Sequence, residues 1–261
     1  MMNLRPIALS LTATLALTGF SACSAPGKTP VAVSDPVSAA VNTAGQIVED
    51  YDFRFIDRTA EKIEEYKTYD YTEGHPTPAL LRPEFLPTQD IAKKAGELCQ
   101  SALGMDLSSQ LIALCYMEDP NLSRTQSVVE ASVPIPSSQE NPLFQRAAEV
   151  WLRMDPVTGE LFSYSLYPGQ GCTDPEQPQK DTWPQLAQDF CTAASLGQIQ
   201  STEFTDEDSA YQDWLWAVLE NGDTALFQFS TGNTLTSFEN VTATGGQARV
   251  DALHKKDAVD R

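Results

Sequence analysis

Apolar residues recur at helical spacing in two segments of the central chain. The first segment begins at Thr88, a typical helix cap, and ends at Gly104, a typical C-terminal stop. The second begins at Thr182 and ends at Gly197 with the same signals. The apolar positions that follow the helical period are Ile91, Ala92, Ala95, Leu98, Cys99, Ala102 and Leu103 in the first segment, and Trp183, Leu186, Ala187, Phe190, Cys191 and Ala194 in the second. The pattern predicts two amphipathic helices in which Cys99 and Cys191 hold equivalent positions, 92 residues apart.

Each helical segment is followed by runs with the two-residue alternation of β-strands. These runs cover residues 111–117, 127–135, 148–154 and 161–167 after the first helix, and 211–220, 224–230 and 234–243 after the second. Turn signals at 155–159, which contains Pro and Gly, and at Asn221-Gly222-Asp223 predict hairpins. The order of elements predicts an α+β fold with two related helix-plus-antiparallel-sheet units in tandem, residues 88–180 and 181–243.

The strand at 211–220 is apolar on both faces. Trp214, Trp216 and Val218 alternate there with a second apolar set at 215, 217 and 219. This pattern favours a central strand that a helix covers on one side. We interpret these aromatic residues as core packing, because buried aromatics are the normal content of such strands, and an uncovered side of the strand as the candidate ligand surface.

The chain before these units is organised differently. An apolar run at residues 7–20 follows Arg5 and is too short to span a membrane, so residues 1–22 are predicted to be an export signal peptide. Residues 23–45 are small and Pro-containing, which indicates a flexible tether. Residues 46–87 form an extension with a short helix from Thr59 to Lys67 and a Pro-rich loop, and residues 244–261 a polar tail.

The signal peptide ends in a recognisable motif. The residues Leu17-Thr18-Gly19-Phe20-Ser21-Ala22-Cys23 resemble the lipobox of bacterial lipoproteins. The resemblance implies that Cys23 receives a diacylglyceryl thioether, becomes the mature N-terminus and holds the protein to the extracytoplasmic side of a membrane. With Ser24 next, it implies the outer membrane if the organism is Gram-negative. The alternative is cleavage without lipid, which would leave a soluble secreted protein.

The remaining cysteines fit an exported protein. Cys99, Cys115, Cys172 and Cys191 form an even set, which predicts disulfides rather than a metal site. The three possible connectivities stay open: the local pairs 99–115 and 172–191 close the shortest loops, whereas a 99–191 pair would join the two units. With no Cys-x-x-Cys motif and two histidines in the chain, we predict no metal site.

Charge and motifs exclude several functions. The formal net charge of −19 disfavours nucleic-acid binding, since phosphate contacts require Lys or Arg. A serine hydrolase needs a well-held base, but His75 lies in the Pro-rich loop and His254 in the tail. No phosphate-binding or dinucleotide motif occurs. We therefore expect no catalytic residues and no cofactor, although the abundant carboxylates leave a glycosidase-like pair open.

Two resemblances and one tyrosine cluster suggest a binding role. The hairpin Val150-Trp151-Leu152-Arg153-Met154-Asp155-Pro156-Val157-Thr158-Gly159-Glu160-Leu161 and the order of elements over residues 88–243 resemble tandem PepSY-type domains, and are also similar to the tandem units of β-lactamase-inhibitor proteins. The PepSY likeness implies binding or restraint of an envelope protease. Tyr66, Tyr69 and Tyr71 favour either a protein interface or packing of their loop.

The function that we predict is a lipid-anchored, non-catalytic binding or accessory role in the cell envelope, with an envelope protein as possible partner. The alternatives are an envelope hydrolase that uses paired carboxylates and a periplasmic inhibitor-like or scaffold protein.

Overall fold

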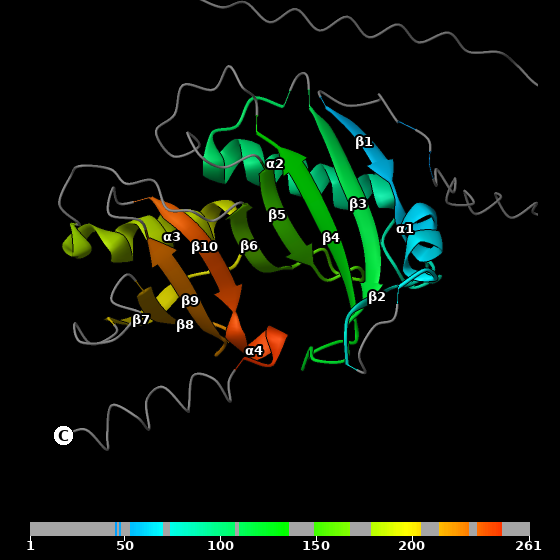
Figure 1. Ribbon diagram of the computed structural model, residues 1–261. Helices are drawn as coiled ribbons and strands as arrows, with labels where there is room; N and C mark the ends of the chain where they lie inside the picture. Colours follow the sequence, from blue (N-terminus) through cyan, green and yellow to red (C-terminus); the bar gives the residue numbers. More distant parts are fainter. Residues whose placement is uncertain are drawn as a thin grey trace, which may run out of the picture. The chain divides into compact units, whose positions relative to one another are not determined.

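A computed structural model describes residues 45, 47, 53–69, 74–107, 110–135, 149–167, 179–204, 214–229 and 234–246. These residues form an α+β fold in which a few helices pack on a large, mostly antiparallel sheet (Figure 1). The predicted fold class is confirmed. The signal peptide, Cys23, Tyr71, Cys172, His254, the tether apart from residue 45 and the tail beyond residue 246 lie outside the described residues.

The first repeat consists of helix α2 and four antiparallel strands. α2 (Thr88–Leu103) precedes β3 (Leu111–Glu118), β4 (Ser127–Pro134), β5 (Glu149–Met154) and β6 (Leu161–Tyr167). These strands pair in chain order. Three elements come before the repeat: β1 (Arg54–Asp57), parallel to β3, then α1 (Thr59–Tyr66), and β2 (Thr77–Pro78), which pairs with β3 further along.

The second repeat has the same order of elements. A 3₁₀ turn, η2 (Lys180–Thr182), leads into α3 (Trp183–Ala193). The strands β7 (Ile199–Phe204), β8 (Trp214–Leu219), β9 (Thr224–Phe229) and β10 (Leu235–Asn240) follow, and α4 (Val241–Thr244) comes after them. These four strands also pair in chain order.

The two repeats join through their last strands. β6 and β10 run antiparallel, with Tyr164 opposite Phe238, and this pairing makes one ten-stranded sheet of the described strands. The strand order is β1-β3-β4-β5-β6-β10-β9-β8-β7, so the second repeat follows the first in reverse. An approximate two-fold relation between β6 and β10 therefore connects the repeats.

One face of the sheet carries the main hydrophobic core beneath α2 and α3, which cross behind the strands in Figure 1. Alternate strand residues point into this core because side chains of a strand alternate between faces. They include Ile112, Leu114 and Tyr116 of β3, Val129, Ala131 and Val133 of β4, Val150, Leu152 and Met154 of β5, Leu215, Ala217 and Leu219 of β8, and Ala225, Phe227 and Phe229 of β9.

The opposite face is covered only in part. One small cluster holds Met117, Leu122, Val128, Phe162 and Ala243, and another holds Trp216, Leu226 and Val241. Since Val241 and Ala243 belong to α4, this short helix covers the outer face near the junction of the repeats. Trp216 is thus 6% exposed and packs in a core, as predicted, and the alternative of a ligand surface around it is not open.

Several predicted boundaries need correction. Pro87 rather than Thr88 is the N-cap residue of α2, whereas Gly104 ends that helix as predicted, with a left-handed φ of 63°. α3 ends at Ala193, four residues before Gly197, because Ser195 already takes a positive φ of 56°. The last predicted strand stops at Asn240, where α4 begins.

The cysteines do not form the predicted local pair. Cys99 lies in the main core under α2, whereas Cys115 packs on the other face of the sheet, and both are free thiols. The sheet separates the two thiols, so the candidate disulfide between Cys99 and Cys115 does not form. Cys191 is also a free thiol, which contradicts a bond to Cys99 or to Cys115, and its third candidate partner, Cys172, lies outside the described residues. Burial raises the pKa of all three thiols to about 12, which keeps them protonated.

Candidate functional site

The outer face of the first repeat is hollowed next to α1. Most of the strand residues there alternate with the core positions, so their side chains point away from α2. A cavity of about 340 Å³, which we call the face cavity, lies between these strands and α1. Its lining consists of Arg58, Lys62, Tyr66, Ala113, Leu114, Cys115, Met117, Glu130, Ala131, Ser132, Glu149 and Trp151.

The register of β4 and β5 brings the polar residues of the face cavity together. Ser132 lies directly opposite Trp151, and Pro134, the next residue of β4 on that face, lies opposite Glu149. The Ser132 hydroxyl donates a hydrogen bond to the Glu149 carboxylate. A polar carboxylate, a hydroxyl and a 40% exposed indole therefore share one small surface.

Glu130 is held differently from Glu149. Burial raises the pKa of Glu130, while Arg153 opposes this effect and Asp119 adds to it. Arg153 Nε lies 3.4 Å from Glu130 Oε1, but that nitrogen makes no hydrogen bond within the described structure. The guanidinium of Arg153 also donates to Asp119 at 2.5 Å. Arg153 is therefore shared between two carboxylates.

The basic residues at the rim of the face cavity have acidic partners on their own helix. Arg58 Nε donates to Glu61 at 2.9 Å, and Lys62 Nζ to Glu65 at 2.6 Å. Glu61, Glu64 and Glu65 form an exposed face of α1, and Lys67 bonds to Glu64 in the same way.

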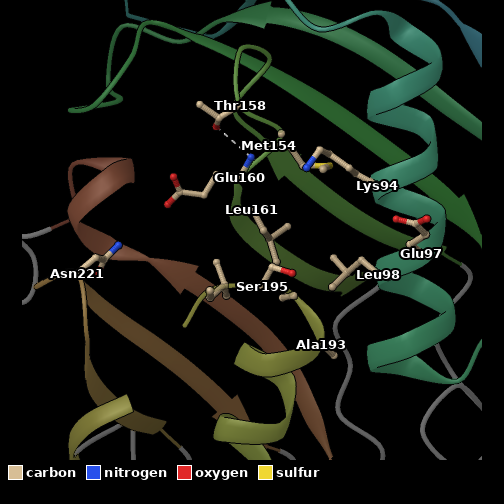
Figure 2. Close-up of a pocket in the computed structure, with 13 residues that line it drawn as sticks. Lys94, Glu97, Leu98, Met154, Thr158, Glu160, Leu161, Ala193, Ser195 and Asn221 are labelled. Carbon is tan, nitrogen blue, oxygen red and sulfur yellow. Dashed lines mark hydrogen bonds between the residues drawn. The ribbon is translucent and has the colours of Figure 1, made fainter. Parts of the chain in front are cut away.

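A second cavity, which we call the seam cavity, lies where the two repeats meet (Figure 2). Its volume is about 420 Å³, and its polar side chains are Lys94, Glu97, Thr158, Glu160, Ser195 and Asn221. Lys94 reaches from α2 toward the turn between β5 and β6, where its Cδ would lie 2.3 Å from a Cβ placed on Gly159. Because residue 159 is a glycine, with φ 71°, there is room for the aliphatic part of the Lys94 side chain.

The seam cavity has a counterpart of about 260 Å³ at the other end of the contact between α2 and α3. Each helix residue of one cavity matches a residue of the other at the 92-residue offset of Cys99 and Cys191. The matching pairs are Lys94 and Leu186, Glu97 and Asp189, Leu98 and Phe190, Ser101 and Ala193, Ala102 and Ala194, and Leu103 and Ser195.

A cavity that the internal repeat produces twice is explained by helix packing alone. The face cavity is different, because the outer face of the second repeat is filled by Trp216, Leu226 and Val241. We therefore take the face cavity as the candidate site.

Of the other predicted residues, Tyr66 and Cys115 line this site. Tyr69 is 65% exposed, and His75 is exposed with its Nδ1 2.8 Å from the carbonyl oxygen of Pro76. The described residues contain no group of side chains suited to hold a metal ion. Among them, no helix combines the length and the apolar character needed to cross a bilayer.

Comparison with known proteins leaves the function open. No protein family matches the chain, and no curated protein is similar to it. Among solved structures, the chain is similar to the Bacillus megaterium YpeB C-terminal domain, with a TM-score of 0.40 and 11% sequence identity. The match covers 60% of this chain and 63% of that one, less than two thirds of its length. A likeness this weak does not support carrying over a function, and the resemblance to PepSY-type domains stays a prediction.

Sequence reasoning missed the residues of the face cavity. Glu130, Ser132 and Trp151 alternate with the apolar residues of their strands, so the period of two contained a signal that could have placed them together on one face. The missing information was that α1 leaves this part of the face open.

Proposed function

We propose that this chain is a non-catalytic binding protein of the cell envelope, attached to a membrane through a lipid on Cys23, and that a partner protein docks on the outer face of the first repeat. The observation that supports this proposal is the face cavity, where Trp151 stands 40% exposed among polar side chains. Tryptophan, tyrosine and arginine are the residue types enriched among binding hot spots. A docking surface of this kind is what an accessory or inhibitor-like protein of the envelope would need.

A hydrolase with paired carboxylates is the second candidate, because Glu130 and Glu149 line the same cavity. Burial favours the protonated form of Glu130, as a general acid requires. Binding is the better interpretation, since Glu130 already pairs with Arg153 of the neighbouring strand. Hydrolysis of envelope glycans by the purified protein, lost in Glu130→Gln, would favour the hydrolase instead.

Replacing Cys23 by serine is expected to release the protein from the membrane. Without the thiol no thioether can form, so the protein carries no acyl chains. Each buried CH₂ of such a chain contributes about 0.8 kcal/mol to membrane anchoring. Fractionation of cells that express either form should show wild type in the membrane pellet and Cys23→Ser in the soluble fraction. An unchanged distribution would refute the lipid anchor.

Replacing Trp151 by alanine is expected to reduce capture of an envelope partner by about tenfold or more, because a hot-spot tryptophan contributes about 2 kcal/mol or more. The measurement is quantitative pull-down from envelope extract with the full mature chain. Val218→Ala is the matched control, since Val218 is also an exposed apolar side chain (37%), on β8 of the second repeat. Equal capture by both variants would contradict docking at the face cavity.

A further inference from the structure

Glu149 carries a charge that the described structure does not neutralise. Its carboxylate accepts a hydrogen bond from the neutral Ser132 hydroxyl, and none of the ion pairs among the described residues includes it. Its side chain is half-buried within the face cavity. A carboxylate in such a position gains free energy when a cation approaches, because water screens it less than at an open surface.

The described cations that line the face cavity or contact its Glu130 already have other partners. Arg58 and Lys62 bond to the glutamates of α1, and Arg153 is shared between Asp119 and Glu130. A ligand that carries a positive charge would therefore match Glu149.

Trp151 indicates which cation fits best. It lies opposite Ser132, the residue that binds Glu149, so the indole and the carboxylate border the same space. A guanidinium can stack on an indole while it donates two parallel hydrogen bonds to a carboxylate, whereas an ammonium is a compact point charge. An arginine side chain can therefore contact the indole and the carboxylate at the same time.

We infer that the face cavity receives an arginine side chain from a basic segment of the partner, held between the Trp151 indole and the Glu149 carboxylate. This inference rests on the proposed function and names its partner chemistry. The net charge of −19 favours the approach of a basic segment at long range.

The test uses two short acetylated peptides that differ at one position, arginine or its neutral isostere citrulline. Binding to the mature chain is followed through the indole N–H resonance of Trp151 in NMR spectra, assigned with Trp151→Phe. We expect a saturable shift with the arginine peptide and none with citrulline. Glu149→Gln should weaken binding by about tenfold, and added salt should weaken it further.

Glu203→Gln is the matched control, because it removes the same charge from an exposed residue on the edge strand β7. It should bind as wild type does. Equal binding of both peptides, or equal affinity of Glu149→Gln and Glu203→Gln, would overturn the inference. If Glu149→Gln still captures a partner in a way that depends on Trp151, only the arginine inference is overturned and the proposed function stands.

Discussion

Replacing Asp223 by alanine is expected to lower the free energy of unfolding by about 3 kcal/mol, since removal of one partner leaves buried polar groups without a hydrogen bond. Asp223 lies in the turn between β8 and β9, and its side chain is 7% exposed. Its carboxylate accepts hydrogen bonds from Arg124 at 2.5 Å, Asn240 at 2.8 Å and Asn221 at 3.0 Å. Alanine removes the one oxygen that accepts all three hydrogen bonds.

This cluster links the two repeats. Arg124 belongs to the loop between β3 and β4, and it also donates to Glu160 at 2.7 Å. Asn240 belongs to the end of β10, where its Oδ1 caps α4 by accepting from the Ala243 N–H at 3.0 Å. Loss of Asp223 therefore weakens the cap of α4 as well as the ion pair. Urea denaturation of wild type and Asp223→Ala measures the difference, and Asp181→Ala, at an exposed site, is the control.

The effect of Asp223 should depend on pH. Burial alone would raise the pKa of this carboxyl, but hydrogen bonds from Asn240 and Arg124 outweigh it and lower the pKa below 3.8. A lowered folded-state pKa contributes stability that is present above the unfolded-state pKa and is lost as pH falls through the folded-state value. The difference between wild type and Asp223→Ala should therefore be full near neutral pH and shrink below about pH 4. A difference that does not change with pH would contradict the ionised cluster.

Replacing Phe190 by alanine is expected to lower the free energy of unfolding by about 3–5 kcal/mol, the usual cost of removing a buried phenylalanine. Phe190 of α3 is 5% exposed. Its ring centroid lies 5.6 Å from that of Tyr164, 5.4 Å from that of Phe238 and 6.3 Å from that of Phe227. Tyr164 and Phe238 face each other across the β6–β10 junction, so this ring packs over the line where the repeats join.

Thermal or urea unfolding measures the Phe190 effect. Leu186→Ala, one helical turn earlier and 36% exposed, is the control and should cost about 1 kcal/mol or less. Similar losses in the two variants would mean that the ring does not pack the junction. If each repeat folded independently, Phe190→Ala would instead produce two separate transitions.

The sequence by itself determined the local elements of this protein. The period of the apolar residues predicted both long helices and most strands, and Gly104 and the turn at 155–159 marked their ends. These signals succeed because helix and strand periods and turn conformations depend on residues close together in the chain. The 92-residue offset between the helices was also visible and proved to relate two cavities.

Edge elements escaped sequence reasoning for a physical reason. β7 is exposed along most of its length, so it needs no apolar face and shows no clear alternation. β1 has four residues and is held in the sheet by pairing with β3, which lies far along the chain. Backbone hydrogen bonds stabilise such strands whatever their side-chain pattern.

Only the tertiary structure decided which surfaces are covered. The alternation of β4 and β8 fixes two faces for each strand, yet α4 closes the outer face around Trp216 while α1 leaves the face around Trp151 open. The period of a strand follows from backbone geometry, whereas coverage depends on contacts between segments distant in sequence. The separation of Cys99 from Cys115 by the sheet has the same origin, since their spacing of 16 residues contains no information about the face that each one occupies.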